Sequence, residues 1–160
     1  MTNVFSPQEI LRIAIKVEEN GKQLYEMLAK NAKEKKIKDI WNYLATQEGL
    51  HKKTFEEMLE KAGDYVVYEY SPGEYDAYLK AISAQYVFAP EHIAKKIYDG
   101  FASDIDALDF GISIEKDSIL IYSALRKYIK ADKQSAIDKV LFEEKDHLVK
   151  LILLKDSLKK

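Results

Sequence analysis

Apolar positions recur every three or four residues over most of the chain, which is the period of an amphipathic α-helix. Gly and Pro are scarce inside these stretches, so the helices are expected to be long. Ser6, Pro7 and Glu9 form a helix-start signature, in which a capping hydroxyl precedes a proline at the first helical position. The pattern predicts four long helices, at about residues 7–30, 33–62, 104–130 and 132 to nearly the last residue.

Only a few residues separate the first helix from the second, and the third from the fourth, so each pair is expected to form an antiparallel hairpin. The crossover, at about residues 63–102, differs in composition: it holds two of the three prolines and seven of the eleven tyrosines. Within it, residues 65–70 are expected to be extended, and 74–86 and 91–101 to form short helices.

A connection of this length can carry the chain from one end of a bundle to the other, as in the ferritin-like arrangement of four helices. The sequence therefore predicts an all-α fold: one ferritin-like domain over residues 1–160, with two antiparallel helical hairpins joined by one long crossover. An ordinary up-and-down bundle with a decorated loop is the alternative.

The two predicted hairpins repeat each other. The inward-facing stripes of the first and third helices match at a displacement of 97 residues, and those of the second and fourth helices match at 96. The paired positions in the first and third helices are Leu11/Leu108, Ala14/Gly111, Glu18/Glu115, Gly21/Ser118, Tyr25/Tyr122 and Leu28/Leu125. Those in the second and fourth are Trp41/Ile137, Leu44/Val140, Glu48/Glu144, His51/His147, Phe55/Leu151 and Met58/Leu154. Glutamates and histidines thus occupy positions on faces that belong in a core.

Four carboxylates, from Glu18, Glu48, Glu115 and Glu144, therefore converge in an apolar interior with no Lys or Arg on the same stripes. Buried charge of this kind costs several kcal/mol unless it is compensated. Two histidines could neutralise only part of it, whereas two divalent cations would neutralise all of it. One Glu from each of two helices and a Glu-x-x-His step from each of the other two make the ligand set of di-iron and di-manganese bundles.

The sequence thus predicts metal ligands at six positions: Glu18, Glu48, His51, Glu115, Glu144 and His147. Two alternatives stay open, namely that these side chains are solvated, or that they form a metal-free buried network that sets helix register. Tyr25 and Tyr122, two turns beyond a glutamate, are candidates for hydrogen bonds to a ligand of the opposite hairpin; each could equally be a core tyrosine with another polar partner.

The composition argues against several classes of partner and of functional site. The formal charge of −2 argues against nucleic acid as a partner, because phosphate binding needs a basic surface. The chain has no cysteine, which excludes disulfides, zinc ribbons and cysteine nucleophiles. No apolar run reaches the length of a membrane span, and the first residues lack the features of a signal peptide. A cytoplasmic protein is expected.

With these residues laid out, the chain resembles the rubrerythrin group of ferritin-like di-iron carboxylate proteins. Residues 17–25 and 114–118 and the two Glu-x-x-His steps carry the resemblance. It implies a non-haem di-iron oxidoreductase that reduces hydrogen peroxide or dioxygen, with two iron ions as cofactor, or manganese or zinc in their place. It further implies that Glu18 and Glu115 are terminal ligands, Glu48 and Glu144 bridging ligands, and His51 and His147 terminal imidazoles.

The chain departs from the rubrerythrin pattern at two points. It has no rubredoxin-type four-cysteine site, so an external electron-donor protein is expected. Ser118 stands where rubrerythrins carry an additional carboxylate, which favours a second hypothesis: a non-catalytic module for iron or manganese binding, storage or sensing. A purely structural bundle is a third. The sequence leaves the oligomeric state open, with a homodimer among the alternatives.

Overall fold

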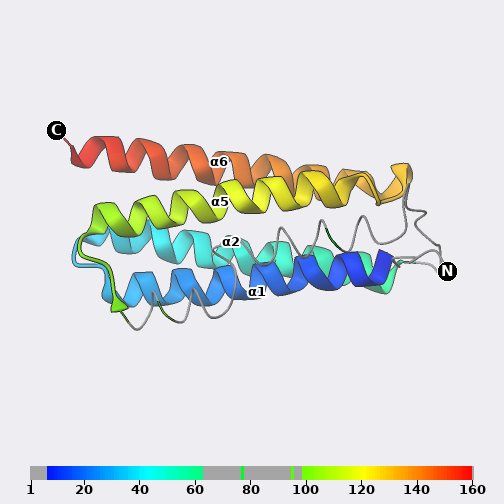
Figure 1. The fold of residues 1–160 in the computed structure, drawn as a ribbon, viewed down its shortest axis with the longest axis horizontal. Helices are drawn as coiled ribbons and strands as arrows, with labels where there is room; N and C mark the ends of the chain where they lie inside the picture. The colour runs from blue at the N-terminus through cyan, green and yellow to red at the C-terminus, as the bar shows by residue number, and fades with distance from the viewer. Residues whose placement is uncertain (1–6, 63–76, 78–94, 96–98, 160) are drawn as a thin grey trace.

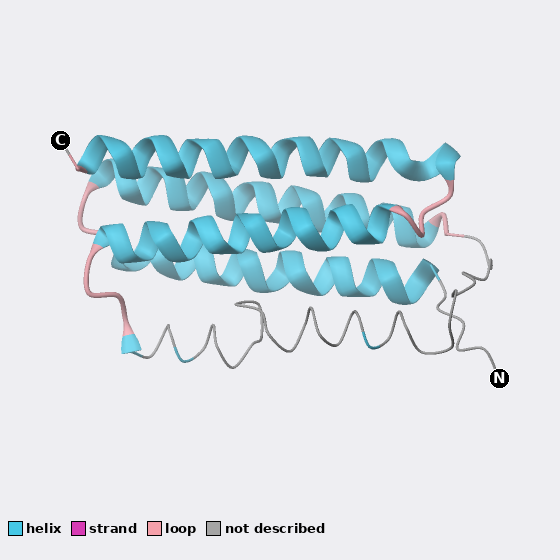
Figure 2. Cartoon of the chain, turned by 45° about the horizontal axis from the view of Figure 1, so that its top comes forward, coloured by secondary structure: helices cyan, strands magenta, loops and turns pink. Residues whose placement is uncertain are grey.

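A computed structural model describes residues 7–62, 77, 95 and 99–159 of the chain. The described part contains four long helices and one short 3-10 turn (Figure 1). They are α1 (Pro7–Asn31), α2 (Lys35–Glu60), α5 (Asp104–Arg126), the 3-10 turn η1 (Ala131–Lys133) and α6 (Gln134–Leu158). All four long helices follow the long axis of one bundle (Figure 2).

The course of the helices shows which bundle this is. α1 packs mainly against α2, and α5 mainly against α6, so the chain forms two antiparallel hairpins as expected. α2 and α5 run in the same direction, and α2 ends at the opposite end of the bundle from the start of α5 (Figure 1). An up-and-down bundle would make these two helices antiparallel. The fold is therefore the predicted ferritin-like four-helix bundle, and the up-and-down alternative is wrong.

Most of the crossover lies outside the described residues. The segment predicted to be extended, residues 65–70, falls there entirely. Ala77, Lys95 and Asp99 are helical and lie within the two segments predicted as short helices. The extent of the domain, residues 1–160, stays a prediction.

The core forms where the two repeated stripes predict it. Every member of the α1 and α5 stripes is buried, and so are the first five members of the α2 and α6 stripes. The last members, Met58 and Leu154, are both partly buried. Matching burial at matching positions means that the sequence repeat is also a structural repeat, with α1 equivalent to α5 and α2 to α6.

The start of α5 follows the sequence signal, since the N–H of Asp106 donates to the Ser103 hydroxyl at 3.1 Å. The end of α5 does not. The helix stops at Arg126 instead of about residue 130, because the amide of Gln134 donates to the carbonyl oxygens of Arg126 (3.2 Å) and Ile129 (2.8 Å). These bonds satisfy carbonyl groups at a helix end from across the turn. The next helix accordingly starts at Gln134 instead of near Asp132.

One pair of residues breaks the repeat without breaking the fold. A Cβ atom on Gly111 of α5 would lie 2.8 Å from Cη2 of Trp41 on α2, closer than atoms can pack. The equivalent pair in the repeat is Ala14 and Ile137. The absence of a side chain at Gly111 thus leaves room for the large indole of Trp41. The equivalent positions in the other half of the bundle carry alanine and isoleucine.

We expect Gly111→Ala to destabilise the protein by about 1–3 kcal/mol, because the added methyl group would push the Trp41 ring away from its stacked position on Tyr25. The double variant Gly111→Ala/Trp41→Ile, which copies the Ala14/Ile137 pair, should lose less stability than the sum of its two single variants. Urea unfolding of the four proteins measures this coupling. Strict additivity would contradict the proposed fit.

Candidate metal centre

The six predicted ligands meet in the middle of the bundle. α1 contributes Glu18, α5 contributes Glu115, and one turn each of α2 and α6 contributes a Glu and a His. None of the six side chains is more than 3% exposed. The alternative in which they are solvated is therefore wrong. The i, i+3 step puts the glutamate and histidine of each pair on one face of their helix.

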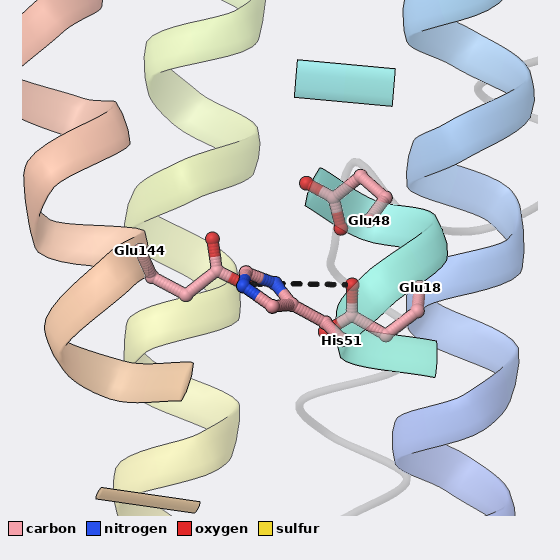
Figure 3. A group of neighbouring side chains, drawn as sticks. All are labelled: Glu18, Glu48, His51 and Glu144. Carbon is pink, nitrogen blue, oxygen red and sulfur yellow. Dashed lines mark ion pairs between the residues drawn. The ribbon is translucent and has the colours of Figure 1, made fainter. Parts of the chain in front are cut away.

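The six residues form two groups of four, and two residues belong to both. In the first group, Glu18, Glu48, His51 and Glu144 each offer a ligand atom within 4.8 Å of the others (Figure 3). Glu48, Glu115, Glu144 and His147 form the second group by the same measure. Glu48 and Glu144 are the shared residues, so the geometry suits two cations held side by side with two carboxylates between them.

Buried atoms without hydrogen-bond partners lie in this cluster; four of them face its centre, and Nε2 of His147 lies on the outer side of its ring. Among the described residues, five buried side-chain atoms lack such a partner: Oε2 of Glu18, Nδ1 of His51, Oε2 of Glu115, Oε1 of Glu144 and Nε2 of His147. Native proteins pair nearly all of their buried polar atoms. Carboxylate oxygen and imidazole nitrogen are ligands for iron, manganese and zinc. The donor set and its unpaired atoms therefore fit a pair of such ions.

Both tyrosines of the repeat donate to a carboxylate of the opposite hairpin. The Tyr25 hydroxyl lies 2.5 Å from Oε1 of Glu115, and the Tyr122 hydroxyl bonds Oε1 of Glu18. In each glutamate, one oxygen is thus occupied by a phenol and the other faces the cluster. The tyrosines are fully buried, so these bonds hold the two terminal carboxylates in position.

Burial sets the protonation of the metal-free cluster. It raises the pKa of Glu18 and Glu48 well above the ordinary value, and that of Glu115 to about 8. Burial lowers the pKa of His51 and His147, but the neighbouring carboxylates outweigh it and raise both to about 9. Glu144 contacts both rings, and despite its burial the hydrogen bond with His147 and the nearby His51 ring hold its pKa at about 2. Without metal, the cluster therefore holds protons that cations would displace.

Gly21 leaves space for one of the shared carboxylates. A Cβ atom at this position would lie 3.3 Å from both Cδ and Oε2 of Glu48. Because a contact this close forces the carboxylate to move, the absence of a side chain is part of the site. Its repeat counterpart, Ser118, is buried and also small.

We expect Gly21→Ala to lower metal affinity by about tenfold, the lower end of the loss caused by disturbing a ligand's surroundings. The fold should persist, because alanine favours a helix more than glycine does. Gly49→Ala is the matched control, since its Cβ would meet only Cδ of Lys22, at 3.9 Å. Titration calorimetry with Mn²⁺ on all three proteins measures the effect, and equal affinities would contradict this role for Gly21.

Comparison with known families agrees with this geometry. The family model for rubrerythrin matches residues 9–100, which is more than half of the chain. The chain belongs to the rubrerythrin family. The match covers the first hairpin and its ligands; Glu115, Glu144 and His147 lie beyond it and enter the site through the structural repeat.

A solved structure extends the likeness of this rubrerythrin-family chain to both hairpins. It is a protein from Thermotoga maritima described as a ferritin-like diiron-carboxylate protein, with 25% sequence identity and a TM-score of 0.73. The alignment covers 98% of each chain. No curated protein matches the sequence. None of the helices in the described ranges is long and apolar enough to cross a membrane.

One neighbour of this rubrerythrin-family site was missed in the sequence. Glu143, next to Glu144, points at the outer edge of His51, with its Oε2 3.0 Å from Nε2 of the ring. The sequence repeat could have revealed Glu143, because the equivalent residue, 96 positions earlier, is the uncharged Gln47. A difference of charge beside otherwise matching ligands marks this position as distinct.

Proposed function

We propose that this protein is a non-haem di-iron oxidoreductase that reduces hydrogen peroxide or dioxygen with electrons from an external donor. One observation carries the proposal: two groups of four buried ligands share Glu48 and Glu144. Membership of the rubrerythrin family and the likeness to a protein described as diiron-carboxylate support iron as the metal.

The residues of the chain would hold and shield the ions. In the first position Glu18 and His51 would be the terminal ligands, and in the second Glu115 and His147, with Glu48 and Glu144 common to both. Two ferrous ions, when bound, can together supply the two electrons that convert hydrogen peroxide, with two protons, into two water molecules. Burial of all six side chains keeps bulk water away from this chemistry.

The two tyrosines and the donor complete the proposal. Tyr25 and Tyr122 would keep Glu115 and Glu18 in fixed orientations while the charge of the site changes. The chain contains no cysteine and hence no rubredoxin-type iron site, so the reductant must come from another molecule. A small electron-donor protein is the proposed partner, and the cytoplasm the proposed location.

A second function is favoured by one residue. Ser118, which is 2% exposed, stands one turn after Glu115 where the rubrerythrin pattern has another carboxylate. Without that carboxylate the site has fewer ways to rearrange its ligands when the metal changes oxidation state. The alternative is therefore a module that binds iron or manganese for storage or sensing and does not turn over.

Repeated turnover separates the two functions. The metal-free chain is loaded anaerobically with ferrous iron, given an excess of a chemical reductant, and mixed with many equivalents of hydrogen peroxide. The enzyme is expected to consume the peroxide over many cycles, whereas a binding module would oxidise its iron once and stop. Glu48→Gln serves as the control for peroxide loss through free iron. Consumption limited to one equivalent per iron pair would refute the oxidoreductase proposal.

A further inference from the structure

The two histidines of the site have different outer surroundings. The His51 ring is 1% exposed, and its Nδ1 faces the cluster, 3.3 Å from Oε1 of Glu144 and 3.6 Å from Oε2 of Glu18. Its other nitrogen, Nε2, lies 3.0 Å from Oε2 of Glu143, a carboxylate that is 31% exposed at the edge of the site. Both nitrogens of the His51 ring therefore face carboxylates.

In the His147 ring, only Nδ1 faces carboxylates of the cluster. Its Nδ1 also faces the cluster, 3.2 Å from Oε2 of Glu144 and 3.6 Å from Oε2 of Glu115. Its Nε2 is buried and has no hydrogen-bond partner among the described residues. The His51 ring stacks on that of His147 with centroids 5.5 Å apart, and Tyr43 meets the His147 ring edge-on at 5.7 Å.

The structural repeat has an uncharged residue at the position equivalent to Glu143. Helix α6 places Glu143 immediately before Glu144, and helix α2 places Gln47 immediately before Glu48. All six ligands and both hydrogen-bonding tyrosines are the same in the two halves. The carboxylate at position 143 therefore has no counterpart at position 47.

We propose that Glu143 is a positioning residue that makes the two metal positions unequal, so that the position built on Glu18 and His51 fills first. A carboxylate that accepts the outer N–H of a metal-binding histidine fixes the ring and strengthens its other nitrogen as a donor. Glu143 also adds a negative charge beside the first position. The inference rests on the metal-binding part of the proposed function and does not depend on turnover.

The interaction with the histidine is the main contact of Glu143. Glu143 also forms an ion pair with Lys139, whose Nζ lies 3.9 Å from Oε1 and whose side chain is 74% exposed. An exposed i, i+4 pair of this length contributes little. Oε2 points instead at a ring that is almost fully buried. A carboxylate serving only as surface charge would not need this orientation.

Site-resolved metal titration tests the proposal. The diamagnetic ion Zn²⁺ is added stepwise to the metal-free full-length chain carrying ¹⁵N-labelled histidine, and the ¹⁵N chemical shift of each ring nitrogen is followed by NMR. Native mass spectrometry counts chains with no, one or two ions at each step. In the wild type the His51 nitrogen is expected to shift to its metal-bound position before that of His147, with one-ion chains above their statistical share.

Two variants locate the effect at Glu143. Glu143→Gln gives α6 the residue that α2 has at position 47, so the ¹⁵N shifts of the two rings should then occur at similar Zn²⁺ concentrations. Glu143→Ala also removes the hydrogen-bond acceptor and should lower the affinity of the first position by about 10–100-fold. Glu56→Gln is the control, because Glu56 makes a similar surface pair with Lys52 at 3.8 Å and its loss changes the net charge equally. Thermal melts establish that each variant is folded.

The results distinguish this inference from the proposed function. Simultaneous ¹⁵N shifts of both rings in the wild type, or an unchanged filling order in Glu143→Gln, overturn the role of Glu143 even if the protein reduces peroxide. Ordered filling that depends on Glu143 supports the role even if no turnover is found. A chain that binds neither Zn²⁺ nor Fe²⁺ would overturn both.

Discussion

Glu48→Gln will empty both metal positions at once, whereas Glu18→Gln will weaken only one. The reason is geometric, because Glu48 belongs to both ligand groups and Glu18 to the first alone. Glutamine has the size of glutamate but lacks its charge, so the change removes a bridging anion without leaving a cavity. We expect the iron content of Glu48→Gln to fall close to zero and that of Glu18→Gln to fall to about one ion per chain.

Elemental analysis after anaerobic loading and desalting measures these contents. Glu144→Gln should behave like Glu48→Gln, and Glu115→Gln like Glu18→Gln, because the repeat makes each pair equivalent. Full metal content in Glu48→Gln would show that this carboxylate does not bridge two ions. In its metal-free form Glu48→Gln should be at least as stable as the wild type, because burial favours the neutral form of this carboxyl group. Metal-free Glu144→Gln should be less stable, because the change removes the ionised partner of two buried histidines.

The stability of the fold is also expected to change strongly with pH, and the direction of the change depends on whether metal is bound. In the metal-free fold the pKa of Glu115 is about 8 and those of His51 and His147 are about 9, all above the ordinary values of 4.5 and 6.5. At pH values between these ordinary pKa values and the raised ones, the folded chain binds more protons than the unfolded chain. The free energy of unfolding must therefore decrease as pH rises, through a window from about 5 to about 9.

Glu144 acts in the opposite direction but outside this window. Because the pKa of Glu144 is lowered to about 2, its carboxylate contributes its full stabilisation of the fold at pH values above the ordinary pKa of 4.5. This contribution is lost only as the pH falls from 4.5 toward 2. We expect the melting temperature of the metal-free protein to drop by at least about 5 °C between pH 6 and pH 9, the size of a change of a few kcal/mol in a chain of this length.

Bound metal should reverse the trend. Cations displace the protons of the cluster, so metal affinity rises with pH and the stabilisation by metal rises with it. Differential scanning calorimetry of the metal-free and Mn²⁺-loaded protein at several pH values makes the comparison. Parallel curves for the two forms would mean that the ions bind elsewhere than at the buried glutamates and histidines.

Much of this architecture can be predicted from the sequence, because one repeated pattern determines both the fold and the site. The stripes that form the core also contain Glu18, Glu48 and their counterparts, so assigning the buried face of each helix assigns the cluster. The structure brings all six of these residues together. Their role as ligands stays a prediction until metal content is measured.

Other features depend on contacts between residues that local pattern does not connect. The end of α5 is fixed by the Gln134 side chain from across a turn, and helix periodicity carries no information about that bond. The close packing of Gly111 on Trp41 depends on the distance between two helices. The hydrogen bond from His51 to Glu143 joins α2 to α6 and follows from their relative rotation, which the spacing of apolar residues does not specify to within one side chain.

The internal repeat has an implication for how such a centre can arise. One hairpin, over residues 7–62, already contains a Glu, a Glu-x-x-His step and a tyrosine that reaches across to the other half. Two identical hairpins related by a two-fold axis would supply the complete set. A gene half as long could thus have encoded an ancestral dimer with both halves of the centre alike, and duplication and fusion would then have freed single positions, such as 47 and 143, to diverge.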